Sequence, residues 1–569
     1  MIRASICSFL MCLFCSFVVF SDDKTVTDIL AGHAAYKKPV DFANFQVPSE
    51  APSFVGRQAG TLKLTAQLSD GFEVVADPSK IAKNSKFKLW DLPGFTFDFV
   101  VNSADIIPVR RGAIESNHPY FEWILEPGKV WKTPKGLVRF SLPVALMERG
   151  ANCIHTGVLM GTLSASGSPE KAMLQIGSET CLYFKFNKWA LLQSQWIEKP
   201  LPSSSTVVEN YREEVANRLP VQPITELSSL HPALTEDALS QNTLIDPSDM
   251  TLFGAVVDGI HYVSDCDTRL GAYPHCDVLP LPSYSVAKSL VAGLGLLRLE
   301  KLYPEAMKAQ VADYVPICAK ANWLGVSFEN LLDMTSGHYR SVEAREDENN
   351  HSLPFFLTND VDEKLAFACK KFKRQTTPGK QWVYRTTDTF ILSVAMQAFW
   401  QEKRGRDADY YRDLLVPLWR SLGLSPVIDL TRRTEGRASV PYAGYGLILH
   451  RSDAAKVAAE LANPSDAFLS QFPRDELRAA LQQEPNNSGF QAGSERLRYN
   501  NGFWGWNTKD FADCATDSWL PFMSGYGGIS LVMMPEGAVY YYFSDSGKFP
   551  IAGPVALFAN IKPICKEPS

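Results

Sequence analysis

Apolar and polar residues alternate along several short segments in the first third of the chain. Residues 61–66, 94–100 and 181–186 show this two-residue period, and clusters of Gly, Pro, Asn and Asp separate such runs. The period is typical of β-strands that bury one face. Residues 199–206 have the composition of a linker and end the region. We therefore predict a β-rich, sandwich-like accessory domain over residues 22–205, in which no catalytic constellation stands out.

Beyond the linker, apolar residues recur mainly every three or four positions, which is typical of amphipathic helices. Strand patterns flank these helices at both ends of the region. The order predicts an α+β domain over residues 206–569, in which the two ends build one antiparallel sheet flanked by helices. Ser452 and Asp453 are expected to cap the last helix. The expected helices cover residues 207–218, 286–302, 326–334, 360–371, 387–402, 406–421 and 452–461, and the expected strands cover 252–257, 259–263, 529–534 and 538–543.

The N-terminus has the pattern of an export signal. A positive start, Met1 to Arg3, precedes an apolar run over residues 6–20, and acidic residues follow Ser21. Small Ser21 suits cleavage after it. We predict a signal peptide over residues 1–21 and an exported protein, either periplasmic or secreted. The alternative is an uncleaved membrane anchor, but the apolar run is shorter than the ~20 residues that a spanning helix needs.

Cysteine usage supports export. Three of the 11 cysteines lie in the predicted signal, which leaves an even number in the mature chain. An even number in an exported protein indicates disulfides, whereas free buried thiols are the alternative in a reducing compartment. Spacing alone does not fix the connectivity, and we take neighbours in sequence as the expected pairs: Cys153–Cys181, Cys266–Cys276, Cys318–Cys369 and Cys514–Cys565.

Charge and composition narrow the function. The 569 residues, 46% hydrophobic and 21% charged, suit a folded protein of two or more domains. The net charge of −6 gives no general electrostatic reason to bind nucleic acid or an anionic membrane. The 9 histidines form no ligand-like cluster, and no cofactor fingerprint stands out. We expect no metal, no cofactor and a small-molecule partner.

Residues 283–289, Ser-Tyr-Ser-Val-Ala-Lys-Ser, carry the clearest chemical pattern and open a predicted helix. Positions i and i+3 share a helix face, so the Ser285 hydroxyl and the Lys288 amine are expected within reach of each other. A serine hydroxyl is a poor nucleophile until a base takes its proton, and a desolvated lysine can be that base. The same spacing opens no long apolar helix at Ser21/Lys24, Ser85/Lys88 or Ser168/Lys171.

Two later segments offer partners for this pair. Tyr384 follows a Pro-Gly turn and precedes a predicted helix, and a tyrosine near an ammonium can relay a proton between nucleophile, leaving group and water. Ser524, Gly525 and Tyr526 enter a predicted strand, where a backbone N–H can pair with that of Ser285 as an oxyanion hole. Each feature also has a structural interpretation, a core tyrosine in one case and a tight turn in the other.

Together, these motifs resemble the serine hydrolases of the class C β-lactamase-like family, which includes penicillin-binding proteins, esterases and amide hydrolases. The resemblance runs from about residue 250 to residue 560. Residues 331–337, Leu-Leu-Asp-Met-Thr-Ser-Gly, and the glycine-containing segment 442–453 are similar to further family signatures. The resemblance implies Ser285 as nucleophile, Lys288 as its base, Tyr384 as acid/base, and the N–H groups of Tyr526 and Ser285 as oxyanion donors.

Two positions depart from the family pattern. Thr386 stands where many members have the asparagine of Tyr-x-Asn, and Met523 stands where many have a lysine or histidine. Loss of that cation removes a group that would hold a β-lactam carboxylate. The motifs are most similar to the branch of 6-aminohexanoate-oligomer hydrolases and related esterases. The resemblance implies a serine hydrolase that cleaves an ester or amide through an acyl-enzyme, and the predicted signal peptide makes it an exported one. The alternatives are a penicillin-binding, D-alanyl peptidase-like protein acting on peptidoglycan and a non-catalytic binding member of the fold.

Overall fold

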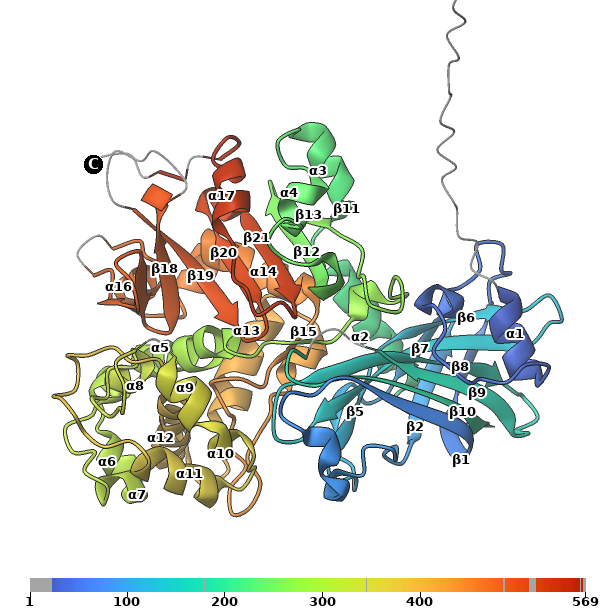
Figure 1. The fold of residues 1–569 in the computed structure, drawn as a ribbon, viewed down its shortest axis with the longest axis horizontal. Helices are drawn as coiled ribbons and strands as arrows, with labels where there is room; N and C mark the ends of the chain where they lie inside the picture. The colour runs from blue at the N-terminus through green and yellow to red at the C-terminus, as the bar shows by residue number, and fades with distance from the viewer. Residues whose placement is uncertain are drawn as a thin grey trace, which may run out of the picture.

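The computed structural model describes residues 23–177, 181–343, 345–484, 487–510, 518–562 and 564–565. The predicted signal peptide, residues 1–21, lies outside this part of the chain. Two units lie side by side, a β-rich unit from the N-terminal third and a mixed unit of helices and strands from the remainder (Figure 1). Within the described residues, no helix combines the length and the apolar character needed to cross a membrane.

The β-rich unit follows helix α1 (Asp23–Ala31), and its described residues form ten strands in one sheet. The strands are β1 (Arg57–Ala76), β2 (Thr96–Asn102), β3 (Asp105–Pro108), β4 (Gly112–Ile114), β5 (Phe121–Leu125), β6 (Gly128–Lys132), β7 (Val138–Glu148), β8 (Ile154–Leu163), β9 (Glu170–Ile176) and β10 (Lys185–Glu198). Their order is β4-β5-β7-β6-β3-β2-β1-β10-β9-β8, and β8 also pairs with β7, so the eight strands from β7 to β8 in this order close into a ring, from which β5 and β4 extend. The unit is therefore a closed antiparallel barrel, which we call the barrel.

The predicted β-rich character is confirmed, whereas the sandwich-like arrangement is replaced by this closure. Strand β1 is 20 residues long and pairs with both β2 and β10. The hydrogen-bonded sheet is therefore continuous through β1, whereas a sandwich would have two separate sheets. The strand expected at residues 181–186 begins only at Lys185. A disulfide from Cys181 to Cys153 and a hydrogen bond from the Tyr183 hydroxyl to Glu148 anchor the residues before it.

The mixed unit is built on a nine-stranded sheet. Its order is β11-β13-β12-β21-β20-β19-β18-β17-β16, and β12 from the start of the unit pairs antiparallel with β21 from its end, as predicted. Strands β14 (Leu281–Pro282) and β15 (Ile448–Leu449) form a separate antiparallel pair. The strands of the large sheet are β11 (Val221–Pro223), β12 (Met250–Val257), β13 (Ile260–Val263), β16 (Phe490–Gln491), β17 (Leu497–Asn500), β18 (Phe503–Asn507), β19 (Trp519–Gly525), β20 (Ile529–Met533) and β21 (Val539–Ser544).

Helices occur where the three-to-four-residue period predicted them. Helix α14 begins at Arg451, one residue earlier than expected, because the Asp453 carboxylate accepts a hydrogen bond from the His450 N–H at 3.0 Å and so caps the turn before Ser452. The helices are α2 (Ser204–Ala216), α3 (Ile224–Leu230), α4 (Glu236–Ser240), α5 (Leu294–Leu302), α6 (Val311–Tyr314), α7 (Pro316–Ala319), α8 (Phe328–Leu332), α9 (Glu346–His351), α10 (Leu353–Phe356), α11 (Val361–Lys370), α12 (Thr386–Arg404), α13 (Val416–Ser421), α14 (Arg451–Ala462), α15 (Asp466–Leu469), α16 (Arg474–Ala480) and α17 (Ala552–Phe558).

Helices cover both faces of the nine-stranded sheet. Along β12, Leu252 and Val256 belong to a core with residues of α5, α12 and α14, whereas Phe253 and Val257 belong to a second core with residues of α3, α4 and α17. This alternation buries both faces of the strand and explains why β12 reads as a continuous apolar run. The predicted α+β class, with an antiparallel sheet flanked by helices, is confirmed.

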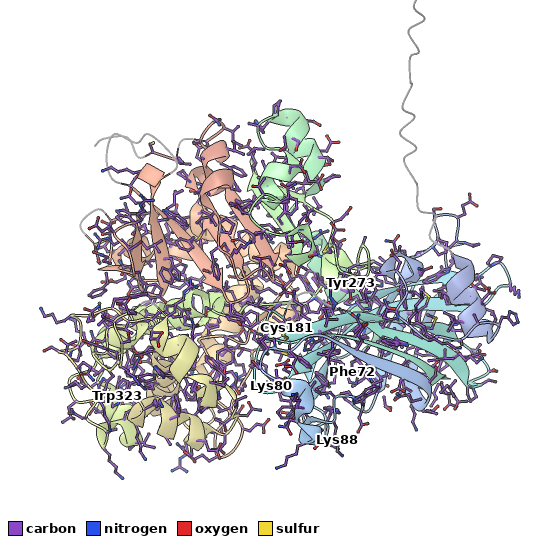
Figure 2. The ribbon with its side chains drawn as sticks, in the orientation of Figure 1. Phe72, Lys80, Lys88, Cys181, Tyr273 and Trp323 are labelled. Carbon is purple, nitrogen blue, oxygen red and sulfur yellow. A yellow bond between two sulfur atoms is a disulfide. The ribbon has the colours of Figure 1, made fainter. Side chains whose placement is uncertain are left out.

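The barrel and the mixed unit share an apolar interface. Strand β8 is buried along its whole length because Leu159 lies in the barrel core whereas Val158 and Met160 lie in the core of the mixed unit. The Tyr273 hydroxyl of the mixed unit donates to Gly157 O at 2.9 Å. Figure 2 shows Tyr273 and Cys181 near this boundary, whereas Trp323 lies among the helices far from the barrel.

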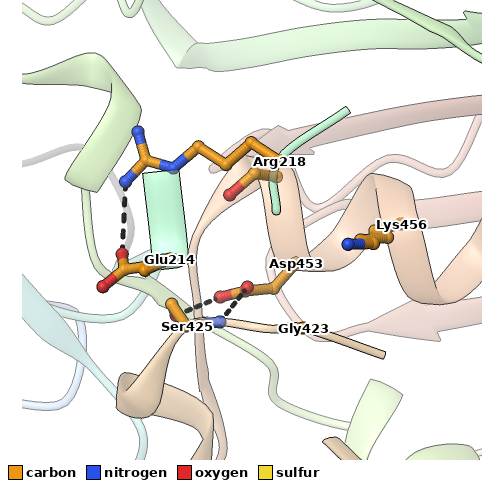
Figure 3. Close-up of a pocket in the computed structure, with 7 residues that line it drawn as sticks. Glu214, Arg218, Gly423, Ser425, Asp453 and Lys456 are labelled. Atoms are coloured by element: carbon orange, nitrogen blue, oxygen red, sulfur yellow. Dashed lines mark hydrogen bonds and ion pairs between the residues drawn. The ribbon is translucent and has the colours of Figure 1, made fainter. Parts of the chain in front are cut away.

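Helix α2 adds a polar part to the interface. Arg111 of the barrel forms ion pairs with Glu126 of the barrel and with Glu214 of α2, and all three side chains are buried. Arg218, one turn further along, contacts Glu214 at 3.2 Å. Close by, Asp453 at the start of α14 accepts hydrogen bonds from the backbone and hydroxyl of Ser425, at 2.8 and 2.6 Å (Figure 3). These contacts fix α2 between the two units.

Three of the four predicted disulfides are confirmed. Cys153–Cys181, Cys266–Cys276 and Cys318–Cys369 are all joined. Cys565 is disulfide-bonded as well, and its expected partner Cys514 lies outside the described residues.

Candidate active site

Ser285 lies directly after a strained backbone turn. The chain leaves β14 at Pro282, and Tyr284 adopts a φ of 41°, a left-handed conformation that costs a non-glycine residue about 1 kcal/mol. A helical turn then starts at Val286, passes through a π-helical segment at Lys288–Gly293 and continues as α5. The Ser285 side chain is half-buried, whereas its neighbours Val286 and Ala287 are fully buried in the core. The turn thus presents one hydroxyl at the edge of a rigid core.

Lys288 is directed at that hydroxyl. Its Nζ donates to Ser285 Oγ at 3.0 Å, to Thr386 Oγ1 at 2.8 Å and to Gly444 O at 3.0 Å. The side chain is only 2% exposed, so these three acceptors replace the water that would otherwise surround an ammonium group. The sequence expectation that Ser285 and Lys288 lie within reach of each other therefore agrees with the geometry.

Tyr384 also lies near the lysine. The Lys288 Nζ is 5.1 Å from the centroid of the Tyr384 ring, within the range of a cation–π contact. The ring stacks against Trp504 of β18, with centroids 5.8 Å apart, and is 8% exposed. Tyr384 is two residues before α12, the helix that also supplies Thr386. The structure thus brings Ser285, Lys288 and Tyr384 together from segments about a hundred residues apart in sequence.

Thr386, which departs from the Tyr-x-Asn pattern, connects Lys288 to a carboxylate. Its hydroxyl accepts from Lys288 and donates to the Glu348 carboxylate, and its backbone N–H donates to the same carboxylate at 2.9 Å. The threonine therefore supplies the acceptor oxygen that an asparagine would offer to the lysine. Glu348, on α9, was not predicted as a site residue, because it lies in a charged run with no motif.

A buried arginine lies beside this chain of hydrogen bonds. Arg385, between Tyr384 and Thr386 in sequence, forms an ion pair with Asp388 and is fully buried. Burial lowers the pKa of Arg385 to about 9, although the carboxylates of Asp347 and Glu348 oppose this shift. Asp347 and Glu348, both on α9, therefore act on Arg385 in addition to its partner Asp388.

The end of β19 lies against the nucleophile turn. A methyl group on Gly525 would lie 2.7 Å from Ser283 O, so only glycine fits without a backbone shift. Ser524 precedes it in β19 and pairs with Ser530 of β20. The ring of Tyr526 lies 5.5 Å from that of Tyr284 and is 44% exposed. Burial raises the pKa of Tyr526, so its hydroxyl stays protonated at neutral pH. The sequence-predicted Gly525 and Tyr526 thus lie next to the turn that carries Ser285.

Gly444 makes a similar close approach. A methyl group there would lie 2.5 Å from Thr389 Oγ1 and 3.6 Å from Lys288 Nζ. The glycine lets its own carbonyl reach the lysine as the third acceptor. The predicted similarity of segment 442–453 to a family signature therefore falls on a part of the chain that contacts Lys288.

One group of possible metal ligands occurs among the described residues. Glu148, Cys153, His155 and Cys181 place one ligand atom each within 4.8 Å of one another. The two cysteine sulfurs are joined in a disulfide, so they do not offer thiolates to a cation.

Comparisons with known proteins find similar solved structures. No protein-family profile matches the sequence, and no curated protein matches it. Similar solved structures are a candidate 6-aminohexanoate-dimer hydrolase from Bacillus anthracis (14% identity, 56% of this chain, 79% of that chain, TM-score 0.40), EstCE1, a hydrolase with promiscuous acyltransferase activity (12%, 57%, 97%, 0.42), and a class C β-lactamase (14%, 56%, 94%, 0.39).

These three solved structures are described as two hydrolases and a β-lactamase. They share 12–14% of their residues with it, at TM-scores of 0.39 to 0.42. Because these TM-scores are low, we base the function on the side-chain geometry of this chain.

Proposed function

We propose that the protein is a serine hydrolase that cleaves an ester or amide bond through an acyl-enzyme on Ser285. The observation that carries this proposal is the 3.0 Å contact between Lys288 Nζ and Ser285 Oγ in a buried site. A buried lysine in contact with a half-buried serine hydroxyl is suited to exchange protons with that hydroxyl.

The proposed reaction has two halves. In the first, Ser285 Oγ bonds to the substrate carbonyl carbon, its proton passes to the Lys288–Tyr384 pair, and that pair protonates the departing alcohol or amine. In the second, water attacks the acyl-enzyme and gives a proton to the same pair, the bond between the acyl carbon and Ser285 Oγ breaks, and the pair returns that proton to Oγ as the acid leaves. The N–H groups of Ser285 and Tyr526 would hold the negative oxygen that forms in each half.

Met523 favours ester or amide substrates over β-lactams and peptidoglycan stems. Where related motifs carry a cation, Met523 is fully buried in the core and cannot bind a carboxylate. We also propose that the protein is exported, because three disulfides form among the described residues and such bonds persist in oxidising compartments.

Hydrolysis of a short-chain nitrophenyl ester by the mature protein and its Ser285→Ala variant tests the proposal. We expect the variant to keep its fold and to lose turnover by at least about a thousandfold, since the nucleophile is gone. Comparable turnover by a folded variant would refute Ser285 as nucleophile. Covalent labelling of Ser285 by a β-lactam would instead favour the penicillin-binding alternative.

A further inference from the structure

Asn152 reaches out of the barrel into the mixed unit. It lies in the turn between β7 and β8 and is 1% exposed. Its Oδ1 accepts from Tyr284 N at 2.7 Å, from Gly446 N at 2.9 Å and from Ser283 Oγ at 3.2 Å. Its Nδ2 donates to Leu447 O at 3.1 Å. One barrel side chain therefore satisfies polar groups on two separate segments of the mixed unit.

Those two segments carry the catalytic groups. The first is the turn in which Tyr284 holds a left-handed φ immediately before Ser285. The second runs from Gly444, whose carbonyl accepts from Lys288, to Gly446, which also has a positive φ of 112°. A non-glycine residue with a left-handed φ, such as Tyr284, persists only where the surrounding structure holds it in place. Asn152 holds both segments through the same oxygen atom.

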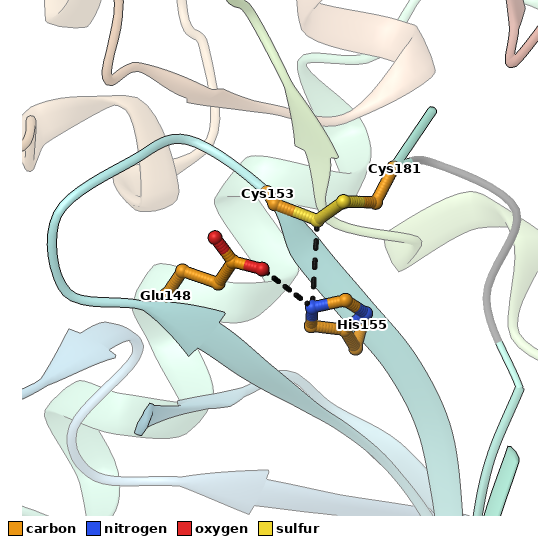
Figure 4. A group of neighbouring side chains, drawn as sticks. All are labelled: Glu148, Cys153, His155 and Cys181. Carbon is orange, nitrogen blue, oxygen red and sulfur yellow. Dashed lines mark hydrogen bonds and ion pairs between the residues drawn. A yellow bond between two sulfur atoms is a disulfide. The ribbon is translucent and has the colours of Figure 1, made fainter. Parts of the chain in front are cut away.

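The barrel in turn holds Asn152 rigidly. The next residue, Cys153, is joined to Cys181 (Figure 4). The Cys153 carbonyl accepts from Glu148 N at 3.0 Å. The Glu148 carboxylate contacts His155 Nε2 at 3.1 Å and accepts from the Tyr183 hydroxyl at 2.7 Å. A disulfide and a buried hydrogen-bond cluster thus fix the turn on both sides of the asparagine.

We propose that Asn152 is a positioning residue of the Ser285 reaction, and that the barrel is therefore part of the active site. Asn152 acts through its hydrogen bonds to Tyr284 N and Gly446 N. These bonds hold Ser285 and the Gly444 carbonyl in fixed positions relative to each other. The proposal rests on the hydrolase function proposed above. It gives the N-terminal unit a role that its own sequence does not reveal.

Asn152→Ala and Asn152→Asp test the proposal, with labelling of Ser285 by a fluorophosphonate probe and ester kinetics as readouts. The alanine removes all four hydrogen bonds, and we expect kcat and the labelling rate to fall about a hundredfold while KM changes little, as for a misplaced catalytic group. The aspartate keeps the accepting oxygen but places a second oxygen against Leu447 O. We expect the kcat and the labelling rate of the aspartate variant to lie between those of the wild type and the alanine variant.

Asn187→Ala is the matched control. Asn187 is also a buried barrel asparagine, but its amide bonds to Glu73 and Arg269 at 3.0 and 3.1 Å, away from the nucleophile turn. We expect its labelling rate to match that of the wild type. A folded Asn152→Ala variant that labels within about threefold of the wild type would overturn the proposal. If that variant does not fold, an Asn152→Asp variant with wild-type kcat would overturn it. Failure of the probe to label the wild type at all would instead contradict the hydrolase function itself.

Discussion

Replacing Thr386 with valine removes one hydroxyl while keeping the shape of the side chain. Lys288 then loses one of its three acceptors, and the Glu348 carboxylate loses a donor. Both groups are shielded, so water replaces the lost contact poorly. A hydrogen bond to a charged group contributes about 1.5–3 kcal/mol. Since about 1.4 kcal/mol of barrier corresponds to a tenfold change in rate, we expect kcat to fall roughly tenfold to a hundredfold.

The assay is steady-state hydrolysis of a nitrophenyl ester, with thermal unfolding to verify the fold. Thr386→Ser is the matched control, because it keeps the hydroxyl and should stay within about threefold of the wild type. Glu348→Gln still accepts from Thr386 but carries no charge, and we expect an intermediate loss. A folded Thr386→Val variant with the kcat of Thr386→Ser would refute the idea that this hydroxyl orients Lys288.

Two further predictions test other parts of the structure. Gly525→Ala places a methyl group 2.7 Å from Ser283 O, and we expect about a tenfold loss of ester turnover. Gly553→Ala is the control, because no atom lies within 4 Å of the added carbon, and it should leave turnover unchanged. Equal turnover in both variants would show that the close approach of Gly525 to Ser283 does not matter. Burial raises the pKa of Asp333 to about 8, so the folded state keeps a proton that the unfolded chain releases above about pH 4. This contribution to stability is complete below that pH and is lost as the pH rises toward 8, by up to about 1.4 kcal/mol per pH unit. Asp333→Asn keeps the acceptor for Asn501 N and removes the titrating carboxyl group. In urea unfolding, the stability of this variant should therefore rise relative to that of the wild type between about pH 5 and about pH 7. Stabilities that change in parallel with pH would contradict the raised pKa of Asp333.

The parts of the site that could be predicted are those encoded locally. Ser285 and Lys288 are one helical turn apart, so their contact follows from helix geometry alone. Tyr384 and Gly525 carry turn and strand signals in their own neighbourhoods. The disulfide pairs between neighbouring cysteines also followed from their order along the chain.

Asn152 and Glu348 could not be predicted, because their contacts depend on how distant segments pack. Asn152 contacts residues more than 130 positions away. Nothing in its own segment predicts that this polar side chain is buried. The barrel closure escaped prediction for the same reason. Alternation identifies strands and their buried faces, but the pairing of β1 with β10, the first and last strands of the barrel, is a property of the whole sheet.

The order of strands along the chain has a consequence for how the protein folds. Every barrel strand is made before the mixed unit begins, and most barrel pairs join strands close in sequence. Strand β12, in contrast, cannot find its neighbour β21 until nearly the whole chain has been synthesised. Domains fold as units during synthesis, and pairings between distant segments form slowly. We therefore expect the barrel to form first and to act as a template on which the later unit assembles, with Asn152 already in place when the nucleophile turn arrives.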